Sequence, residues 1–243
     1  MFKKKLYLPH HNVRGSDLRY ESMVYAQAVD DALVQGHCTL DEEDKVIAMA
    51  GAAMTLHFGD ELGYTVEEIV DQKAHEFVIP EWRMKKSPGD WGRVIFELRN
   101  TFVGYSPEDL QETFLTTYQT SPFFGAHWFY ASKNDAEGLV PGSISTLPRE
   151  LLIGFGPEAM LLCDNTHKLL VSFPYANVSK WSAAAGVFSV MLTAPPEAPE
   201  PFAFSVTSAQ ASDMANLIIE INKAIVLAAA KNANPPGVEQ TNA

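Results

Sequence analysis

The chain has 243 residues, of which 47% are hydrophobic and 20% charged, a composition typical of a packed protein with one or two domains. Its net charge of −12 argues against binding nucleic acid or anionic lipid through bulk charge. No apolar run reaches the roughly 18 residues of a membrane-spanning helix. The basic start Met1–Lys5 has no apolar stretch after it, which argues against a secretory signal. Two distant cysteines, Cys38 and Cys163, form neither a metal-binding spacing nor a disulfide framework, as is usual in a reducing cytosol.

Helical signals dominate the first half of the chain. Apolar residues between Glu21 and Gln35 recur at helical spacing, and Gly36 follows as a stop signal. Residues 45–58 are rich in small side chains, which allow helices to approach closely. Farther along, residues that cap helices precede an acidic first turn or a proline. These start signals are Thr39 with Glu42, Thr65 with Glu68, and Ser106 with Pro107. We therefore predict a helical lobe over residues 1–122.

Short strand signals replace the helical period from Phe124 on. The predicted strands cover residues 126–131, 151–155, 159–163, 169–173, 187–192 and 202–206. Residues 165–167 have the composition of a hairpin turn, and the proline-rich residues 194–201 form a loop. A long helix follows, with one apolar face made by Met214, Leu217, Ile218, Ile221 and Ile225.

These signals predict an α+β protein with two lobes. Residues 1–122 form a helical bundle, and residues 123–232 form an antiparallel β-sandwich capped by the C-terminal helix. The polar residues 233–243 are predicted to be a disordered tail.

No motif predicts catalysis or a cofactor. The sequence Gly154-Phe155-Gly156 lacks the third glycine and the following helix of a dinucleotide loop. The seven histidines have no metal-ligand spacing, and the acidic residues 41–44 are explained by a helix start. We therefore predict a protein that is not an enzyme and that holds neither a metal nor a cofactor.

The surface of the β-lobe is the remaining candidate for a binding site. We predict that Trp181 to Leu192 forms an edge strand beside the closing helix, because a proline-rich excursion follows it. An open edge can accept an extended peptide as an added strand. Trp181 could anchor such a peptide or could simply plug the end of the sandwich, and the two roles are compatible.

Several motifs, in this order and spacing, resemble the FERM domains. They are Phe2-Lys-Lys-Lys-Leu-Tyr, Tyr25-Ala-Gln-Ala-Val-Asp-Asp, His57-Phe-Gly-Asp, Phe124-Gly-Ala-His-Trp-Phe-Tyr, Gly138-Leu-Val-Pro-Gly, Asn177-Val-Ser-Lys-Trp and Phe202-Ala-Phe-Ser-Val. The resemblance covers about residues 2–230 and is closest to talin and to the MyTH4–FERM tails of motor proteins. It implies an acyl-CoA-binding-protein-like helical lobe followed by a PH/PTB-like lobe. A ubiquitin-like first lobe, which the family also has, is missing from these residues.

The resemblance also implies an adaptor that works in the cytoplasm, at the cytoskeleton or the membrane. It would bind the cytoplasmic tail of a membrane protein, or a cytoskeletal protein, by strand addition to the third lobe. The residues implied for this peptide-binding groove are Lys180, Trp181, Ser182, Ala183, Val187, Phe188, Val190, Ala203 and Phe204. Paired aromatic residues expected near Ala203 and Phe204 are reduced to one, which weakens the case for a talin-type pocket.

Other roles stay open at this point. Lys133 is the one basic residue in a loop where lipid-binding relatives carry several, so we expect at most weak binding to anionic lipid. We expect no nucleic-acid partner. The lobes could instead serve as a structural or autoinhibitory module that packs against neighbouring domains of a motor or rod protein. A third possibility is an acyl-chain site within the bundle.

Overall fold

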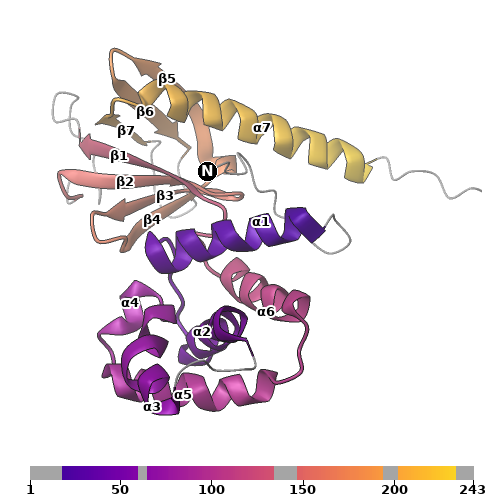
Figure 1. Ribbon diagram of the computed structural model, residues 1–243. Helices are drawn as coiled ribbons and strands as arrows, with labels where there is room; N and C mark the ends of the chain where they lie inside the picture. The colour runs from indigo at the N-terminus through magenta and orange to yellow at the C-terminus, as the bar shows by residue number, and fades with distance from the viewer. Residues whose placement is uncertain (1–17, 60–64, 134–146, 194–201, 234–243) are drawn as a thin grey trace, which may run out of the picture. The chain divides into compact units, whose positions relative to one another are not determined.

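The computed structural model describes residues 18–59, 65–133, 147–193 and 202–233 (Figure 1). The chain divides into two compact units, with the boundary between Gly125 and Ala126. The first unit is helical, and the second contains a sheet and a long helix. None of the helices described is long and apolar enough to cross a bilayer.

The helical unit is built around α2, which packs against α5 and α6. Small residues on α2 let its neighbours approach, since a Cβ at Gly51 would lie 3.2 Å from the ring of Phe102. The first helix ends in a π-helical turn, followed by Gly36 at φ +74°, which is the expected stop. In chain order, the elements are α1 (Leu18–Val29), π-helix η1 (Asp30–Val34), α2 (Glu43–Phe58), α3 (Val66–Glu68), π-helix η2 (Ile69–Lys73), 3₁₀-helix η3 (Ala74–Phe77), α4 (Pro80–Arg83), α5 (Pro88–Arg99), 3₁₀-helix η4 (Asn100–Phe102) and α6 (Pro107–Gln119).

Two of the predicted helix starts are confirmed. The amide of Thr65 donates to Glu68 Oε2 at 3.0 Å, and the amide of Glu68 donates to Thr65 Oγ1 at 3.3 Å, which is a reciprocal capping box. At the start of α6, the amide of Asp109 donates to Ser106 Oγ at 3.2 Å. Both caps satisfy amide groups that have no partner inside their own helix.

The predicted helix start at Thr39 is wrong. Helix α2 begins at Glu43, with Glu42 as its N-cap residue. The hydroxyl of Thr39 instead donates to Glu81 Oε2 at 2.8 Å, and its amide donates to Ser121 Oγ at 3.2 Å. Contacts to residues far along the chain therefore outweigh the local capping signal.

In the described residues of the second unit, seven antiparallel strands form a sheet in the order β4-β3-β2-β1-β7-β6-β5. A long helix, α7 (Ala211–Ala233), packs on β5 and β6. This arrangement confirms the predicted α+β class. The strands are β1 (His127–Lys133), β2 (Glu150–Phe155), β3 (Ala159–Asp164), β4 (Leu169–Pro174), β5 (Val178–Ala184), β6 (Val187–Leu192) and β7 (Phe202–Thr207), with a 3₁₀ turn η6 (Tyr175–Asn177) between β4 and β5.

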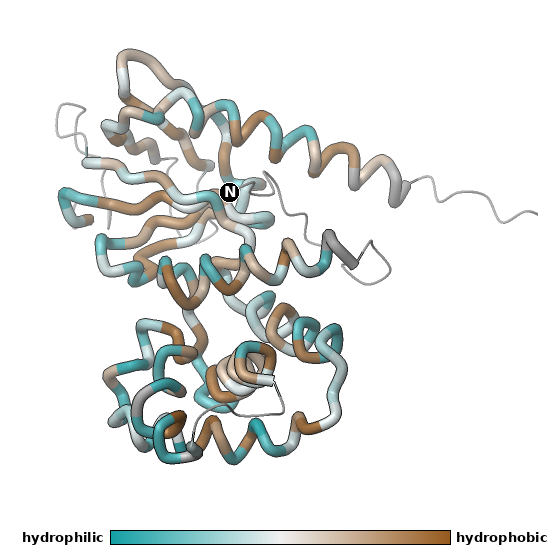
Figure 2. Tube along the Cα trace, viewed as in Figure 1, coloured by the Kyte–Doolittle hydropathy of each residue, from teal (hydrophilic) through white to brown (hydrophobic). Residues whose placement is uncertain are grey.

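The core of this unit lies between the sheet and α7. The apolar face of α7 is buried as far as Ile221, whereas Ile225 is 39% exposed. Hydrophobic and hydrophilic residues alternate along the helix, and its C-terminal part runs past the strands (Figures 1 and 2). The helix residues in this core are Ala211, Met214, Leu217, Ile218 and Ile221.

Several predictions concern residues outside the described part of the chain. These are the motifs at 2–7 and 138–142, the loop at 194–201 and the tail from residue 234.

Candidate functional site

The predicted edge strand from Trp181 to Leu192 is in fact a hairpin. Strand β5 ends at Ala184, and β6 begins at Val187. The two residues between them, Ala185 at φ +51° and Gly186 at φ +77°, have the positive φ values of a type I′ turn. The chain therefore reverses where a single strand was predicted, and β6 lies inside the sheet while β5 forms its edge.

The register of the hairpin fixes which backbone groups of β5 point away from the sheet. Residues beside a two-residue turn form a hydrogen-bonded pair, and such pairs alternate along an antiparallel ladder. Ala184 pairs with Val187 and Ser182 with Ser189, so these residues bond within the hairpin. The Ser208 amide donates to the carbonyl of Gly186 at 2.8 Å. The backbone groups of the even-numbered residues of β6 therefore face β7, which supports this alternation.

Two residues of β5 consequently direct their N–H and C=O groups to the open edge: Trp181 and Ala183. No strand of the described chain pairs with this edge. Toward the start of the strand, the register with β6 shifts between Val178 and Lys180, which interrupts the regular pattern. We call the stretch Trp181 to Ala183, with its outward backbone groups, the β5 edge.

Side chains at the β5 edge divide between two faces. Trp181 and Ala183 are half-buried and pack against the core that β5 shares with α7. Lys180 and Ser182 are exposed. The indole of Trp181 therefore contributes to the end of the core and also remains partly accessible, as both predicted roles require.

Three of the other predicted groove residues lie inside the protein. Phe188, Val190 and Phe204 are 0%, 1% and 6% exposed, respectively. Because β6 and β7 are interior strands, their side chains cannot line an edge. Val187 is half-buried beside the turn, and Ala203 is exposed on β7, two strands from the edge. Within the predicted set, the structure thus brings only Lys180, Trp181, Ser182 and Ala183 to the β5 edge.

The opposite edge of the sheet, β4, is less suited to pairing. The Gly156 amide donates to the Ala159 carbonyl at 3.0 Å, so the odd-numbered residues of β3 bond to β2 and the even-numbered ones bond to β4. Their partners on β4 are Phe173 and Val171, and the backbone groups of Ser172 between them therefore point outward. Pro174 has no N–H to offer, and the register shifts opposite the junction of Leu162 and Cys163. Proline and bulges are the usual protection of an edge strand.

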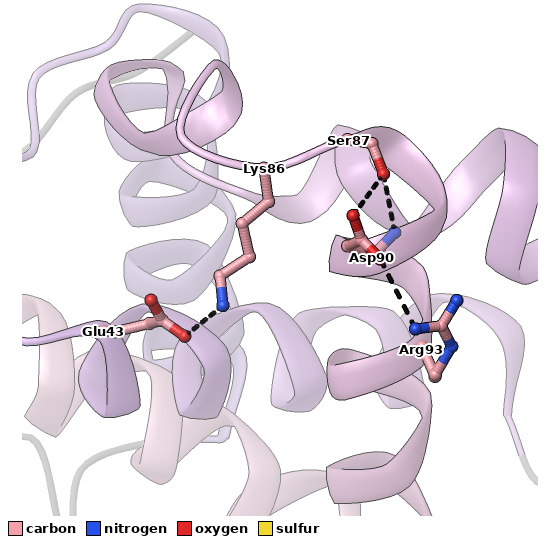
Figure 3. Close-up of polar contacts among 5 residues, drawn as sticks. All are labelled: Glu43, Lys86, Ser87, Asp90 and Arg93. Carbon is pink, nitrogen blue, oxygen red and sulfur yellow. Dashed lines mark hydrogen bonds and ion pairs between the residues drawn. The ribbon is translucent and has the colours of Figure 1, made fainter.

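Sequence reasoning missed a polar cluster in the helical unit (Figure 3). Lys86 Nζ lies 2.7 Å from Glu43 Oε1, an ion pair that joins the segment before α5 to the start of α2. Ser87 caps α5 by accepting from the Asp90 amide at 3.2 Å, and its hydroxyl donates to Asp90 Oδ2 at 2.6 Å. Asp90 also pairs with Arg93 at 3.4 Å. Ser87-Pro88 repeats the signal at Ser106-Pro107, which could have located this helix.

The described residues contain no group of three or more histidine, cysteine, aspartate or glutamate side chains that could hold a metal ion. Burial raises the pKa of the Cys38 and Cys163 thiols to about 12, which disfavours the reactive thiolate. Gly154 lies within β2 beneath the ring of Trp128, and not in a phosphate-binding turn. Lys133, the predicted lipid contact, is half-buried at the end of β1, where its amide bonds the carbonyl of Arg149.

Two family matches account for most of the chain. Residues 16–129 match the FERM central domain, and residues 140–226 match the PTB domain of the IRS-1 type. The first covers the helical unit, and the second covers β2 to β7 and most of α7.

Solved structures share this fold at low sequence identity. The human myosin 7b C-terminal MyTH4-FERM domain, solved in complex with the harmonin-a PDZ3 domain, aligns with a TM-score of 0.67 at 18% identity, over 90% of this chain and 42% of that one. The Dictyostelium discoideum myosin VII MyTH4-FERM MF2 domain aligns with a TM-score of 0.61 at 16% identity, over 83% of this chain and 36% of that one. The Drosophila Merlin FERM and C-terminal domain complex aligns with a TM-score of 0.61 at 11% identity, over 94% of this chain and 71% of that one.

The chain thus spans 42% and 36% of the length of the two myosin domains. The expected likeness to MyTH4–FERM tails is confirmed, and the likeness to talin stays a prediction. FERM domains are typically protein-binding modules. The matched residues and the shared fold make this chain a member of the FERM family, of which it carries the central helical lobe and the PTB-like lobe.

Proposed function

We propose that this protein is a non-enzymatic adaptor whose β5 edge receives an extended peptide as an eighth strand of the sheet. The peptide would come from the cytoplasmic tail of a membrane protein or from a cytoskeletal protein. The observation that carries the proposal is the outward direction of the Trp181 and Ala183 backbone groups at an edge that the described chain leaves open.

Strand addition needs a donor and an acceptor on alternate residues of the edge, because a peptide bonds to every second residue. Trp181 and Ala183 supply two such pairs. The register shift before Lys180 and the turn at Ala185 limit the regular edge to this length. We therefore expect a short pairing segment, with additional affinity from side-chain contacts.

Beside the edge, one end carries a large aromatic side chain that can make an apolar contact with the peptide, and the rest carries small side chains. Trp181 offers a partly accessible indole, and aromatic rings of this kind are frequent anchors in protein interfaces. Ser182 and Ala183 leave the backbone open to approach. Phe188, Val190 and Phe204 would support the strand from the core without touching the peptide. Lys133 would add at most a weak contact with anionic lipid.

One of the solved relatives supports a protein partner. The human myosin 7b domain, which shares this fold, was solved in complex with a PDZ domain. A role in protein binding at the cytoskeleton or the membrane is therefore the function that we propose for this chain as well.

A proline substitution tests the edge itself. Ala183→Pro removes an N–H that points away from the sheet, so the ladder with β6 stays intact while a peptide loses a donor. Ser172→Pro is the matched control, since it removes the outward N–H of the other edge. We expect binding to an array of cytoplasmic-tail peptides to be lost in Ala183→Pro and kept in Ser172→Pro, with unchanged circular dichroism in both variants. Equal binding by the two variants would show that the peptide does not pair with the β5 edge.

Trp181→Ala tests the side-chain anchor separately. We expect weaker binding to the same array, provided that the variant unfolds cooperatively and is therefore folded. Binding equal to that of the wild type would leave the indole with a structural role alone.

A second candidate function is a structural or autoinhibitory interface on the helical unit. Of the exposed large apolar side chains in its described residues, three lie between α4 and α6: Met84 at 92%, Val103 at 61% and Tyr105 at 51%. Val103 and Tyr105 flank Gly104 in the segment between α5 and α6. If this surface carries the function, Val103→Asp with Tyr105→Asp will abolish partner capture that Ala183→Pro leaves intact.

A further inference from the structure

The two faces of the sheet beside the β5 edge differ in chemistry. An added strand would present its side chains to the two faces in turn, because side chains alternate along a strand. On the face that α7 covers, the strand would lie beside Trp181 and Ala183, which are half-buried against the core (Figure 1). On the opposite face, which we call the outer face, it would lie beside Lys180 and Ser182, which are exposed.

Lys180 alone is charged among the described side chains on the outer face of β5 and β6. It pairs across the hairpin with Met191, which is 40% exposed. No carboxylate in the described part of the chain forms an ion pair with Lys180. The ammonium group is therefore available to a bound peptide. The other residues of β5 and β6 on this face are Ser182, Ala184, Val187 and Ser189.

The register of an added strand determines which of its residues can meet Lys180. A peptide residue opposite Trp181 turns its side chain toward α7, so its two neighbours face outward, and one of them lies opposite Lys180. Directly opposed residues have Cβ atoms about 4.5–5.5 Å apart, and opposite charges at this distance attract. Salt at physiological strength screens exposed charges beyond about 8 Å, so the net charge of −12 on the chain does not cancel this local attraction.

The α7 side of the edge does not favour an acidic residue. Asp213, Glu220 and Lys223 are the charged residues of α7 whose side chains are described. Lys223 Nζ already pairs with Glu220 Oε1 at 3.5 Å. A carboxylate turned toward this helix would also lose water beside the half-buried ring of Trp181, which is costly for a charged group. The preference for an acidic residue should therefore alternate along the peptide.

On the basis of the strand addition proposed above, we propose that the β5 edge selects segments in which an acidic residue directly adjoins the apolar residue that packs on Trp181. Lys180 is the residue that recognises the acidic side chain. A basic residue at that position is disfavoured, because like charges directly opposite each other repel. Cytoplasmic residues close to a membrane-spanning helix are commonly rich in lysine and arginine. A membrane-protein segment that binds here therefore lies beyond those basic residues.

Synthetic peptides with one movable charge test this preference. The parent is a peptide of alternating threonine and valine, in which one central valine is replaced by leucine as the apolar anchor and both ends are blocked. Aspartate replaces either the threonine beside the leucine, on each side in turn, or the valine two residues away. We expect aspartate at one of the two threonine positions to tighten binding about threefold, and lysine there to weaken it by a similar factor. Aspartate at the valine positions should weaken binding.

Lys180→Glu should reverse the preference. The peptide with aspartate beside the leucine should then bind about threefold more weakly than the parent, and the lysine peptide more tightly. Lys168→Glu, at the exposed end of the β3–β4 turn, makes the same change in net charge away from the β5 edge and is the matched control. It should leave the preference of the wild type unchanged, and both variants should keep their circular dichroism.

The outcomes separate this preference from strand addition itself. If Ala183→Pro abolishes peptide binding, but neither the place of the aspartate nor Lys180→Glu alters the affinity, the edge receives a strand without selecting an acidic residue and the proposal fails. If no peptide binds, or if Ala183→Pro leaves binding intact, strand addition at the β5 edge is contradicted and the preference fails with it.

Discussion

The ring of Trp128 lies across Gly154 on the neighbouring strand, so close that a Cβ at Gly154 would stand 2.7 Å from it. The contact explains why a glycine interrupts an otherwise apolar strand. It also gives Gly154 a structural role, as a packing site within β2.

Gly154→Ala should therefore destabilise the protein. Inserting a methyl group into a packed site costs about 1–3 kcal/mol, and the ring of Trp128 must move to admit it. Urea denaturation will measure the loss. Trp128→Leu should relieve the clash, so the double variant should lose less than the sum of the two single variants. Strict additivity would mean that the two residues are not coupled.

The cap of α5 should contribute measurably to the helical unit. Ser87→Ala removes the acceptor of the Asp90 amide and should cost about 1 kcal/mol of unfolding free energy. Ser106→Ala makes the same change at α6 and should cost a similar amount. Thr39→Ala provides the contrast, because Thr39 caps no helix. A helicity loss from Thr39→Ala equal to that from Ser87→Ala would contradict the assignment of the caps.

The carboxylate of Asp90 should make this cap sensitive to acid. The hydrogen bond from Ser87 and the charges of Arg93 and Lys86 lower the pKa of Asp90 below its ordinary value of 3.8. A lowered pKa means that the stabilisation is present above pH 3.8 and is lost as the pH falls through the shifted pKa. The difference in melting temperature between wild type and Asp90→Asn should thus shrink below that pH. If the difference in melting temperature stays constant with pH, the charge of Asp90 does not contribute to the stability of the cap.

The hydrogen bond from Trp82 should stabilise the segment that precedes α2. Its indole Nε1 donates to the buried carbonyl of Leu40 at 2.8 Å. Trp82→Phe leaves that carbonyl without its donor and should cost about 1–3 kcal/mol. Chemical denaturation followed by circular dichroism will measure it. Trp82→His keeps a ring nitrogen that can donate to the carbonyl, so it should recover part of the loss. Equal losses of stability in Trp82→Phe and Trp82→His would mean that the packing of the ring matters more than the hydrogen bond.

Much of the fold could be predicted from local signals, and the errors have physical causes. The caps at Thr65 and Ser106 depend on neighbouring residues only, so the sequence was sufficient. Thr39 has the same local signal, but long-range bonds to Glu81 and Ser121 take its polar groups. The two π-helical turns leave no comparable trace in the sequence.

The candidate site was predicted in part. Lys180, Trp181, Ser182 and Ala183 do lie on an edge strand. The prediction extended the strand through Ala185, because alanine rarely takes a positive φ and a turn there has no strong signal. Glycine at the next position was the available clue. That one missed turn moved Phe188 and Val190 from the predicted edge to the core, where the structure places them.

Amide exchange at the β5 edge is the most direct test of strand addition. The amides of Trp181 and Ala183 point away from the sheet, whereas that of Ser182 bonds to β6. In the free protein, nuclear magnetic resonance should find rapid exchange at Trp181 and Ala183 and slow exchange at Ser182. A bound peptide should slow the first two and leave the third unchanged. If a saturating peptide protects amides elsewhere while Trp181 and Ala183 keep exchanging rapidly, the peptide is not an added strand of this sheet.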